Sequence, residues 1–275
     1  MGNPASAPSG SVLFIGTATT LIRFGGFTIL TDPNFLHRGD EVHLGYGLRS
    51  TRQTEPALGF DQLPPLDLII LSHFHEDHFD RVVQQRLARD IPIVTTPDAA
   101  RALRALGFSQ VRELTTWDTW SFRRADVRLR ITAVPAQHTP LRLMQPLLPR
   151  TMGSVLSFSQ VQTEEQLLRM YVSGDTLMHD DLREIPRQFP DIDVGLFHVG
   201  GTRIFGVMLT MDADQAVQAI QVVAPRVAVP IHYDDYDVFK SPLADLQRAV
   251  QAAGLTDRVR YVDRGESVPL AARSV

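Results

Sequence analysis

The feature that most limits what this chain can fold into is the segment HFHEDH at residues 73–78, which places three imidazoles and two carboxylates in six consecutive positions. It follows the apolar run LDLIIL, whose length and branched residues are typical of a short buried strand. If the segment continues that strand, His73 and His75 share one face, because side chains alternate along a strand. Asp77 and His78 then fall in the turn beyond and point to a different place. Imidazole suits zinc and carboxylate accepts zinc or manganese, so the segment predicts a metal site at the rim of a sheet.

Three further metal-competent side chains each follow a strand-like segment far along the chain. His138 comes after the β-branched run ITAV, Asp175 lies at the tip of a Ser-Gly-Asp turn, and His232 ends the apolar run RVAVPI. Ends of strands are where sheet proteins gather functional groups on rigid supports. Taken alone, His138 or His232 is better explained as a structural histidine. Together with the dense segment they favour metal binding, with room for two adjacent ions.

Separated motifs carry a resemblance to a known family. The spacing His-x-His-x-Asp-His at 73–78 is similar to the metal motif of the metallo-β-lactamase fold superfamily. The surrounding sequence resembles its UlaG-like branch, which includes the ascorbate-6-phosphate lactonase and the N-acyl-phosphatidylethanolamine phospholipase D. The resemblance extends over about residues 11–265, and its motifs lie at 14–22 with 29–33, at 73–78, at 134–138, at 172–176 and at 229–233.

The resemblance implies an α/β fold with four layers, an αβ/βα sandwich in which two mixed sheets face each other, flanked by helices, with the metals at one edge. We expect strands within 11–33, joined at the Gly25-Gly26 turn, and paired strands within 110–134. Helices are expected at 80–89, 97–107, 212–223 and 243–253. Residues 11–275 are predicted to form a single catalytic domain after a disordered arm at 1–10.

The resemblance also sorts the candidate ligands into two sets that share one bridge. His73, His75 and His138 would hold the first ion, Asp77, His78 and His232 would hold the second, and Asp175 would bridge the two. Each of these positions carries the residue type that the family has there. Zinc is the first expectation for the two divalent ions, with manganese or iron as alternatives. Because the chain has no cysteine, any metal is held by nitrogen and oxygen alone.

Two aspartates flank the predicted site. An aspartate at the position of Asp32 lies behind the ligands in the family, where it would accept an imidazole N–H. A turn aspartate before Pro33 is the alternative. Asp80 is expected to be the N-cap of the helix that follows the dense segment.

The implied chemistry is hydrolysis. Two cations lower the pKa of a shared water, so that a metal-bound hydroxide exists near neutral pH, and they polarise a carbonyl or phosphoryl oxygen. Asp77 or Asp175 could orient this nucleophile. The sequence therefore predicts a dinuclear metal-dependent hydrolase that acts on a phosphodiester, a lactone or a related ester of a small molecule.

Two positions depart from the family. The phospholipase D branch carries a histidine where this chain has Thr210, and a hydroxyl cannot serve as an acid or base at neutral pH as imidazole can. His198 stands where the family more often has proline. It either faces the cleft and supplies a proton, which makes it a third catalytic candidate, or fills space at a strand end. His179, beside two aspartates, is expected to be solvated or to cap a helix.

Two other functions stay open. A nucleic-acid phosphodiesterase of the same fold should carry a basic surface or an added clamping domain, and the net charge of −4 provides no such surface, so no nucleic-acid partner is expected. A non-hydrolytic relative that handles oxygen or redox chemistry commonly has glutamate in place of the second histidine of the dense motif. His75 argues against that alternative.

The substrate is expected to be a small molecule bound near the loop 139–150, which carries four leucines and one methionine. A subunit contact in a homo-oligomer, or packing against the long irregular stretch 34–64, explains the apolar loop equally well. Four arginines could pair with a phosphate or carboxylate, although each is also typical of a surface arginine: Arg49, Arg142, Arg150 and Arg203.

The N-terminal residues and the hydrophobicity of the chain indicate its cellular location. The first ten residues are small and proline-rich and lack the apolar core of a signal peptide. No apolar run approaches the roughly 18 residues of a membrane span. A cytoplasmic protein with no membrane span is therefore expected.

Overall fold

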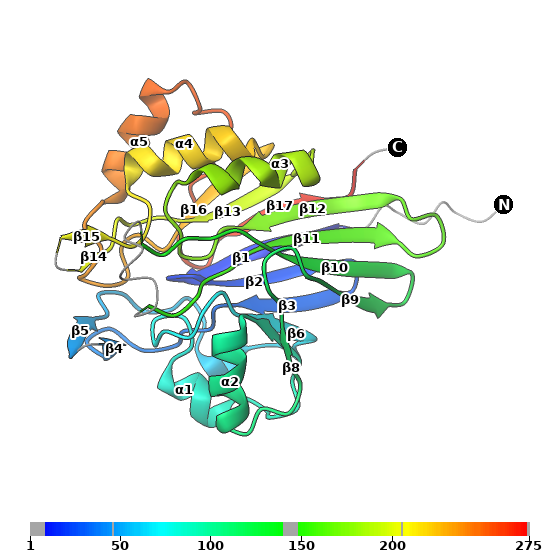
Figure 1. Ribbon diagram of the computed structural model, residues 1–275, viewed down its shortest axis with the longest axis horizontal. Helices are drawn as coiled ribbons and strands as arrows, with labels where there is room; N and C mark the ends of the chain where they lie inside the picture. Colours follow the sequence, from blue (N-terminus) through cyan, green and yellow to red (C-terminus); the bar gives the residue numbers. More distant parts are fainter. Residues whose placement is uncertain (1–8, 46, 140–147, 205, 274–275) are drawn as a thin grey trace.

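Two β-sheets pack face to face, and helices cover the outer side of each (Figure 1). The computed structural model describes residues 9–45, 47–139, 148–204 and 206–273. α1 (Arg81–Arg86) and α2 (Pro97–Ala105) lie outside the first sheet. The second sheet is covered by α3 (Glu184–Gln188), α4 (Ala213–Val223) and α5 (Leu243–Ala252). The expected αβ/βα sandwich is confirmed.

The first sheet has seven strands among the described residues, in the order β17-β1-β2-β3-β6-β7-β8. They are β1 (Ser9–Gly16), β2 (Thr19–Phe24), β3 (Phe27–Thr31), β6 (Leu68–Ile70), β7 (Ile93–Thr95), β8 (Val111–Glu113) and β17 (Ser267–Ala271). Neighbouring strands are antiparallel from β17 to β3 and parallel from β3 to β8. Because parallel strands need crossover connections, α1 and α2 lie between β6, β7 and β8 in the chain.

The second sheet has six strands among the described residues, in the order β16-β13-β12-β11-β10-β9. They are β9 (Thr119–Arg124), β10 (Val127–Val134), β11 (Gly153–Gln160), β12 (Gln166–Val172), β13 (Val194–His198) and β16 (Val227–Ile231). Strands β9 to β12 are antiparallel, and β12, β13 and β16 are parallel. Both sheets are therefore mixed, as expected.

Two short hairpins lie at the same end of the sandwich (Figure 1). One consists of β4 (Glu41–Gly45) and β5 (Leu48–Thr51), and the other of β14 (Arg203–Ile204) and β15 (Val207–Met208). Single turns of 3₁₀-helix occur at Phe60–Gln62 and Asp180–Arg183. None of the helices in the described ranges combines the length and hydrophobicity that a membrane span requires.

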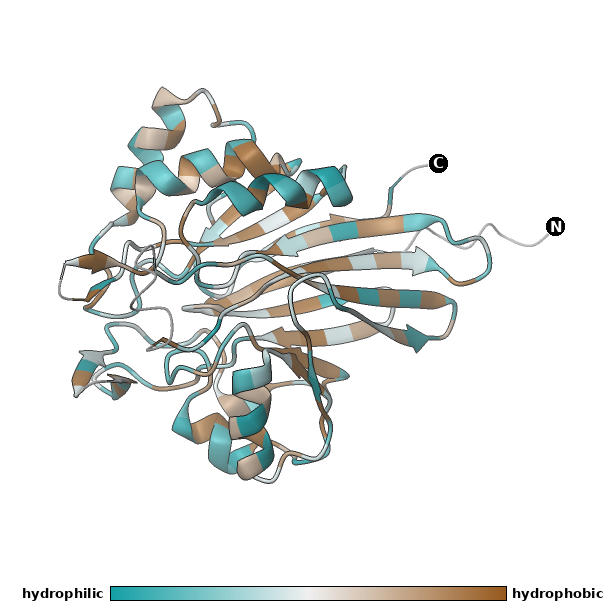
Figure 2. Ribbon diagram, in the orientation of Figure 1, coloured by the Kyte–Doolittle hydropathy of each residue, from teal (hydrophilic) through white to brown (hydrophobic). Residues whose placement is uncertain are grey.

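Apolar side chains from the inner faces of both sheets fill the space between them. Phe24 of β2 and Phe158 of β11 meet edge to face, with ring centroids 5.0 Å apart. Figure 2 shows apolar residues along the strands and hydrophilic residues over much of the outer helices. Burying one large apolar side chain contributes about 1.5–3 kcal/mol, so this layer fixes the two sheets against each other. The loops at the ends of the strands are thereby held on a rigid frame.

The dense motif does not continue its strand, so the condition under which His73 and His75 would share one strand face is not met. β6 covers only Leu68–Ile70, and residues 73–78 form a loop and turns. The physical reason lies at Ser72, whose N–H donates to the Asp32 carboxylate at 2.7 Å instead of to a neighbouring strand. The chain leaves the sheet at that point.

Residues 110–134 do not form one set of paired strands. β8 pairs with β7 of the first sheet, whereas β9 and β10 pair with each other in the second sheet. Between them, the Asp118 carboxylate accepts from the N–H and the hydroxyl of Thr115, at 2.9 and 2.6 Å. This turn carries the chain from one sheet to the other.

The other expected elements are present with shifted ends. β1 to β3 form the strands within 11–33, and the four expected helices are α1, α2, α4 and α5. Asp80 is the N-cap of α1, as predicted, and accepts from the N–H of Val83 at 2.8 Å. α3 was not predicted. Ser9 and Gly10, expected in the disordered arm, belong to β1 and pair with β17, while residues 1–8 lie outside the described part.

We expect Gly174→Ala to destabilise the fold far more than Gly107→Ala. Both glycines have positive φ, +60° and +89°, so alanine at either position costs about 1 kcal/mol of backbone strain. A Cβ on Gly174 would also lie 2.5 Å from the Met152 carbonyl oxygen, whereas none of the described atoms lies within 4 Å of a Cβ on Gly107. Urea unfolding should therefore give at least about 1 kcal/mol more loss for Gly174→Ala. Equal losses would contradict the packing described here.

Candidate metal centre

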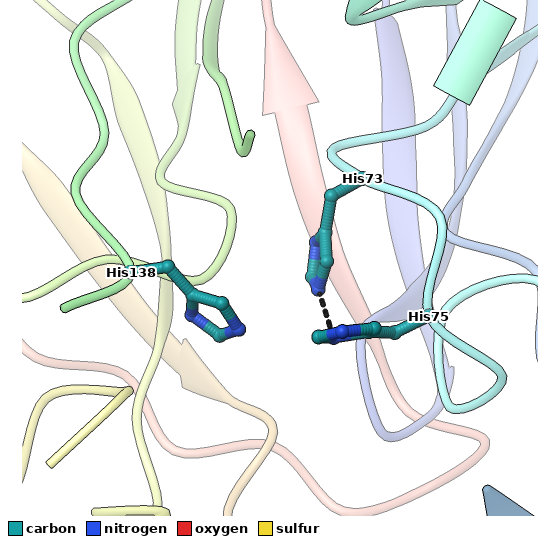
Figure 3. A group of neighbouring side chains, drawn as sticks. All are labelled: His73, His75 and His138. Atoms are coloured by element: carbon teal, nitrogen blue, oxygen red, sulfur yellow. Dashed lines mark hydrogen bonds between the residues drawn. The ribbon is translucent and has the colours of Figure 1, made fainter. Parts of the chain in front are cut away.

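The first set of candidate ligands consists of three imidazoles from two loops. His73 and His75 follow β6, and His138 follows β10. Figure 3 shows the three rings gathered round one space, with Nε2 of His73 2.9 Å from Nδ1 of His75. The His138 ring centroid lies 5.1 Å from that of His73 and 5.5 Å from that of His75. One nitrogen from each ring falls within 4.8 Å of the others, which is close enough for a single ion to bind all three.

The second set consists of Asp77 and His78 from the same loop and His232 from the end of β16. Oδ2 of Asp77 lies 3.7 Å from Nε2 of His78 and 3.6 Å from Nε2 of His232. All three side chains are buried. They also supply ligand atoms within 4.8 Å of one another.

Asp175, which follows β12, lies between the two sets. Its Oδ2 is 3.3 Å from Nε2 of His78 and its Oδ1 is 3.7 Å from Nε2 of His232. Asp175 also forms a group with His73 and His78 whose ligand atoms lie within 4.8 Å. The structure thus brings all seven predicted ligands together, four from the loop after β6 of the first sheet and three from strand ends of the second.

Backbone carbonyls fix the rings of His138 and His232, the two candidate ligand histidines that lie far from the 73–78 motif in the sequence. Nδ1 of His138 donates to the Leu209 carbonyl at 3.0 Å, and Nδ1 of His232 donates to the Val199 carbonyl at 3.2 Å. Because a carbonyl can only accept, Nδ1 carries the proton in both rings. Nε2 of each ring is then the atom turned toward the other ligands, as a metal ligand requires.

Asp32 lies directly behind the second set. Its Oδ2 is 3.5 Å from Nδ1 of His78 and 4.0 Å from Nε2 of His198, and the residue is almost fully buried. Asp32 and His232 have positive φ, 36° and 67°, which is uncommon for residues other than glycine. Such backbone strain is typical of functional sites.

His198, at the end of β13, is fully buried beside the second set rather than exposed in a cleft. Its Nδ1 lies 3.1 Å from Oδ1 of Asp175, and its ring stacks on that of His232 with centroids 5.5 Å apart. It also forms a group with Asp32 and His78 whose ligand atoms are within 4.8 Å. His198 therefore contacts two candidate ligands directly.

The two sets differ in their affinity for protons. Burial, with the charge of neighbouring histidines, lowers the pKa of His73 and His138 and lowers that of His75 to about 4. Burial acts the same way on His78 and His232, but the Asp175 and Asp77 carboxylates together outweigh it and raise the pKa of both rings. A metal ion bound to the second set would have to displace those protons.

Burial also opposes ionisation of the two central carboxylates, yet both stay ionised. The charges of His78 and His232 lower the pKa of Asp77 to about 2 and hold that of Asp175 well below its usual value. The centre therefore combines the three imidazoles of the first set, which are neutral at physiological pH, with two carboxylates that stay ionised. Nitrogen and oxygen donors of this kind are those that borderline divalent ions prefer.

Unpaired atoms test whether a metal fits here. Five buried side-chain atoms of the centre have no hydrogen-bond partner within the part of the chain that the structure describes: Oδ1 of Asp77 and Nε2 of His78, His138, His198 and His232. Leaving one buried polar atom unsatisfied costs about 1–3 kcal/mol, so a cluster of them requires an explanation. Metal ions bound among these atoms provide one, and the residues present fit such ions.

Three of the four arginines singled out in the sequence lie in the described residues, and each has a carboxylate within 4 Å. Arg49 pairs with Glu41 at 2.9 Å and Arg203 lies 3.6 Å from Asp212. Arg150 lines a cavity that includes His138. Arg142, like residues 140–147 of the predicted substrate loop, lies outside the described residues.

Three further residues have structural surroundings that the sequence did not reveal. Thr210 is fully buried, and its hydroxyl accepts from the N–H of Thr202 at 2.8 Å. His179 was expected to be solvated or to cap a helix: its side chain is only 10 % exposed and lines the same cavity as His138, and the residue is the N-cap of the 3₁₀ turn Asp180–Arg183. Ser173 was missed; its hydroxyl accepts from the His198 N–H at 2.8 Å, and its place in the Ser-Gly-Asp turn was the only signal.

The fold and the metal-competent centre define the class: a metal-dependent hydrolase of the metallo-β-lactamase fold. The profile of the Beta-lactamase superfamily domain matches residues 28–233, and the chain belongs to that superfamily. A UPF0173 metal-dependent hydrolase from Cupriavidus taiwanensis is 30% identical over 243 residues, which cover 84% of this chain and 77% of the relative.

Solved structures share the fold over nearly the whole chain. The isothiocyanate hydrolase from Delia radicum gut bacteria has a TM-score of 0.79 at 20% identity, with 96% of this chain and 100% of that one covered. A possible metal-dependent hydrolase from Veillonella parvula has a TM-score of 0.78 at 18% identity, with 96% and 99% covered. At these identities the likeness establishes the fold and not the substrate.

In the metal-free protein we expect the pKa of His78 to lie above that of free imidazole and the pKa of His75 to lie below it. Near pH 6, roughly the usual midpoint, His78 should be protonated beside Asp175, whereas His75, with a pKa of about 4, should be neutral. Ring-nitrogen chemical shifts followed by NMR against pH would measure this. A titration of His75 above that of His78 would contradict the charge distribution described here.

Proposed function

We propose that this protein is a dinuclear hydrolase that uses two divalent metal ions, zinc by preference, to cleave a phosphodiester, lactone or related ester of a small molecule. The observation that carries the proposal is the position of Asp175, with its two carboxylate oxygens 3.3 Å from Nε2 of His78 and 3.7 Å from Nε2 of His232. The same carboxylate groups with His73 of the first set. One carboxylate within reach of both sets is what a bridge between two ions requires.

The site residues would have two roles: all seven would bind the metal ions, and one of them would also orient the attacking water. The first ion would be held by His73, His75 and His138, the second by Asp77, His78 and His232, with Asp175 between them. When bound, the ions would lower the pKa of water and polarise the carbonyl or phosphoryl oxygen of the substrate.

Asp77 would orient the attacking water. Its Oδ1 has no hydrogen-bond partner among the described residues, and with a pKa of about 2 the group accepts hydrogen bonds at all physiological pH values. The water oxygen forms a bond to carbon or phosphorus while the bond to the leaving oxygen breaks. One water proton ends on the leaving oxygen and the other on the product acid.

His198 would act through Asp175 rather than on the substrate. Its Nδ1 lies 3.1 Å from Oδ1 of Asp175, and its full burial removes it from any direct contact with solvent. A hydrogen bond donated to one carboxylate oxygen limits rotation of the carboxylate. We therefore treat His198 as a positioning residue, which differs from the proton-donor alternative of the sequence analysis.

Among branches of the family, a lactonase-like or simple esterase activity is favoured over lipid phosphodiester cleavage. The hydroxyl of Thr210 is buried and bonded to backbone, so no acid or base is available at the position where the phospholipase D branch has histidine. A nuclease is disfavoured by the net charge of −4. The isothiocyanate hydrolase with the same fold adds isothiocyanates to the substrates worth testing.

We expect the purified protein to contain two divalent ions per chain and to lose activity on chelation. His75→Ala and Asp175→Ala should each lower turnover by at least about 100-fold because each removes a ligand. Elemental analysis together with assays on bis(p-nitrophenyl) phosphate and a panel of lactones measures both effects. His37→Ala, at an exposed histidine paired with Glu55, is the matched control and should keep full activity. Turnover that persists after confirmed metal removal would contradict the proposal.

The positioning role of His198 predicts a graded series. His198→Leu should lower kcat by about 10- to 100-fold with little change in KM, and should change the visible spectrum of the cobalt-substituted protein. His198→Asn keeps an N–H near the place of Nδ1 and should recover part of both. If the two variants behave alike, His198 only fills space.

A further inference from the structure

Arg52 is fully buried, although an arginine carries a permanent charge and is rarely found inside a protein. It follows β5 and belongs to neither set of candidate ligands. Its guanidinium contacts two loops that reach the metal centre from different sheets. Nη1 donates to the side chain of Asn34, and Nη2 lies 3.5 Å from Oδ1 of Asp235. Because a buried charge that loses a partner strongly destabilises a fold, the positions of these two loops are tied to that of Arg52.

Asn34 connects Arg52 to the dense motif of the first sheet. Its amide oxygen accepts from Nη1 of Arg52 and from the hydroxyl of Tyr236, the latter at 3.1 Å. Its amide nitrogen donates to the Glu76 carbonyl at 3.0 Å. Glu76 directly precedes Asp77, so this hydrogen bond fixes the backbone that presents a ligand of the second set.

Asp235 connects Arg52 to the loop that carries His232 of the second sheet. The carboxylate is fully buried and accepts from the N–H of Thr17 at 2.7 Å and from Nε of Arg264 at 3.1 Å. Donors from separate segments of the chain thus hold Asp235 in place. His232 comes shortly before it in the same loop and has a strained backbone, with φ of +67°. The contacts of Asp235 help to maintain that conformation.

The β4–β5 hairpin joins the same two loops a second time. The Glu76 carboxylate accepts from the N–H of His43 in β4 at 2.8 Å. The Asp237 carboxylate accepts from the hydroxyl of Ser50 in β5 at 2.6 Å. Glu76 lies in the dense motif and Asp237 lies in the loop after β16, so the segment that contains Arg52 is attached on both sides.

The second set of candidate ligands is divided between these two loops. Oδ2 of Asp77, after β6, lies 3.6 Å from Nε2 of His232, after β16, although β6 and β16 belong to different sheets. The network around Arg52 therefore reaches both halves of this set. The first set differs, because His138, its member from the second sheet, is held by the Leu209 carbonyl.

We propose that Arg52 is a positioning residue that sets the distance between the two halves of the second set, and thereby the affinity for the second ion. It acts through Asn34 on one side and through Asp235 on the other. The inference rests on the proposed function for the presence of two ions, and it adds the residues on which binding of one of them depends.

Asp235→Asn tests the link with almost no change in side-chain size. Asparagine keeps one acceptor oxygen but loses the charge that faces Arg52 and Arg264. We expect the Kd of the second zinc ion to rise by about 10- to 100-fold, while the Kd of the first changes by less than about twofold. Competition for zinc between the protein and a chromophoric chelator measures both constants.

Asp193→Asn is the matched control, because Asp193 is also a buried carboxylate that accepts from one backbone N–H and from arginine. Its partners are the N–H of Arg169 at 2.8 Å and Nε of Arg273 at 3.0 Å. Asp193 directly precedes β13, whereas His198 lies at the other end of that strand. Both variants should lose similar stability in urea, and only Asp235→Asn should weaken the second ion. Equal changes of this Kd, or no change in Asp235→Asn, would overturn the role of Arg52.

A second variant tests Arg52 itself. Arg52→Lys keeps the charge, but one ammonium nitrogen cannot occupy the places of both Nη1 and Nη2. We expect this variant to weaken the second ion by about tenfold and to change the visible spectrum of the protein loaded with two cobalt ions. Tyr236→Phe, which removes one donor to Asn34 and leaves Arg52 in place, should change the same Kd by less than about threefold. A native spectrum and a native Kd in Arg52→Lys would contradict the inference.

The zinc measurements also separate failure of this inference from failure of the proposed function. Two ions in the native protein, with the same second Kd in Asp235→Asn, would overturn the positioning role alone. The expected changes in Kd without metal-dependent ester hydrolysis would overturn the proposed activity alone. A native protein that binds a single ion would overturn the dinuclear function and this inference together.

Discussion

The rest of the structure depends on how one buried carboxylate is compensated. Asp175 is only 3 % exposed, and an isolated charge there would strongly destabilise the fold. Its oxygens lie within 3.7 Å of nitrogens of His78, His198 and His232, which come from the loop after β6 and from the ends of β13 and β16. The positions of β6, β13 and β16 are therefore constrained by the same charge. A substitution that moves any of these strand ends also changes the electrostatic balance of the centre.

Much of the fold was predictable because each motif residue ends a strand whose apolar pattern is visible locally. β10, β12 and β16 lie where the runs before His138, Asp175 and His232 predict them. The errors arose where a tertiary contact overrode the local pattern. The carboxylate of Asp32, which is far away in sequence, accepts a hydrogen bond from the N–H of Ser72, and β6 ends before that residue. The local sequence around Ser72 does not indicate this contact. Likewise the turn at Thr115 directs two neighbouring strands into different sheets, although both have ordinary strand composition.

The set of side chains that meet at the centre was also predictable, since seven metal-competent residues recur with a recognisable spacing. What the sequence could not supply is the layer that orients them. The carbonyls of Leu209 and Val199 fix the rings of His138 and His232, and a carbonyl carries no residue-specific signature. His179 lines a cavity together with residues from distant segments of the chain, and its polar neighbours in sequence do not indicate this position.

The seven side chains come from both sheets, so metal binding at this centre would affect the stability of the whole fold. Within the described strands no backbone ladder joins the first sheet to the second, so apolar packing provides most of the attraction between them. Under the proposed function, cations coordinated from both sides would act as a non-covalent cross-link, and the free energy of their binding would add to that of folding, about 2.7 kcal/mol when the ion is present at 100 times its Kd. Scarcity of that ion would then shorten the lifetime of the chain itself, in addition to reducing the number of active sites.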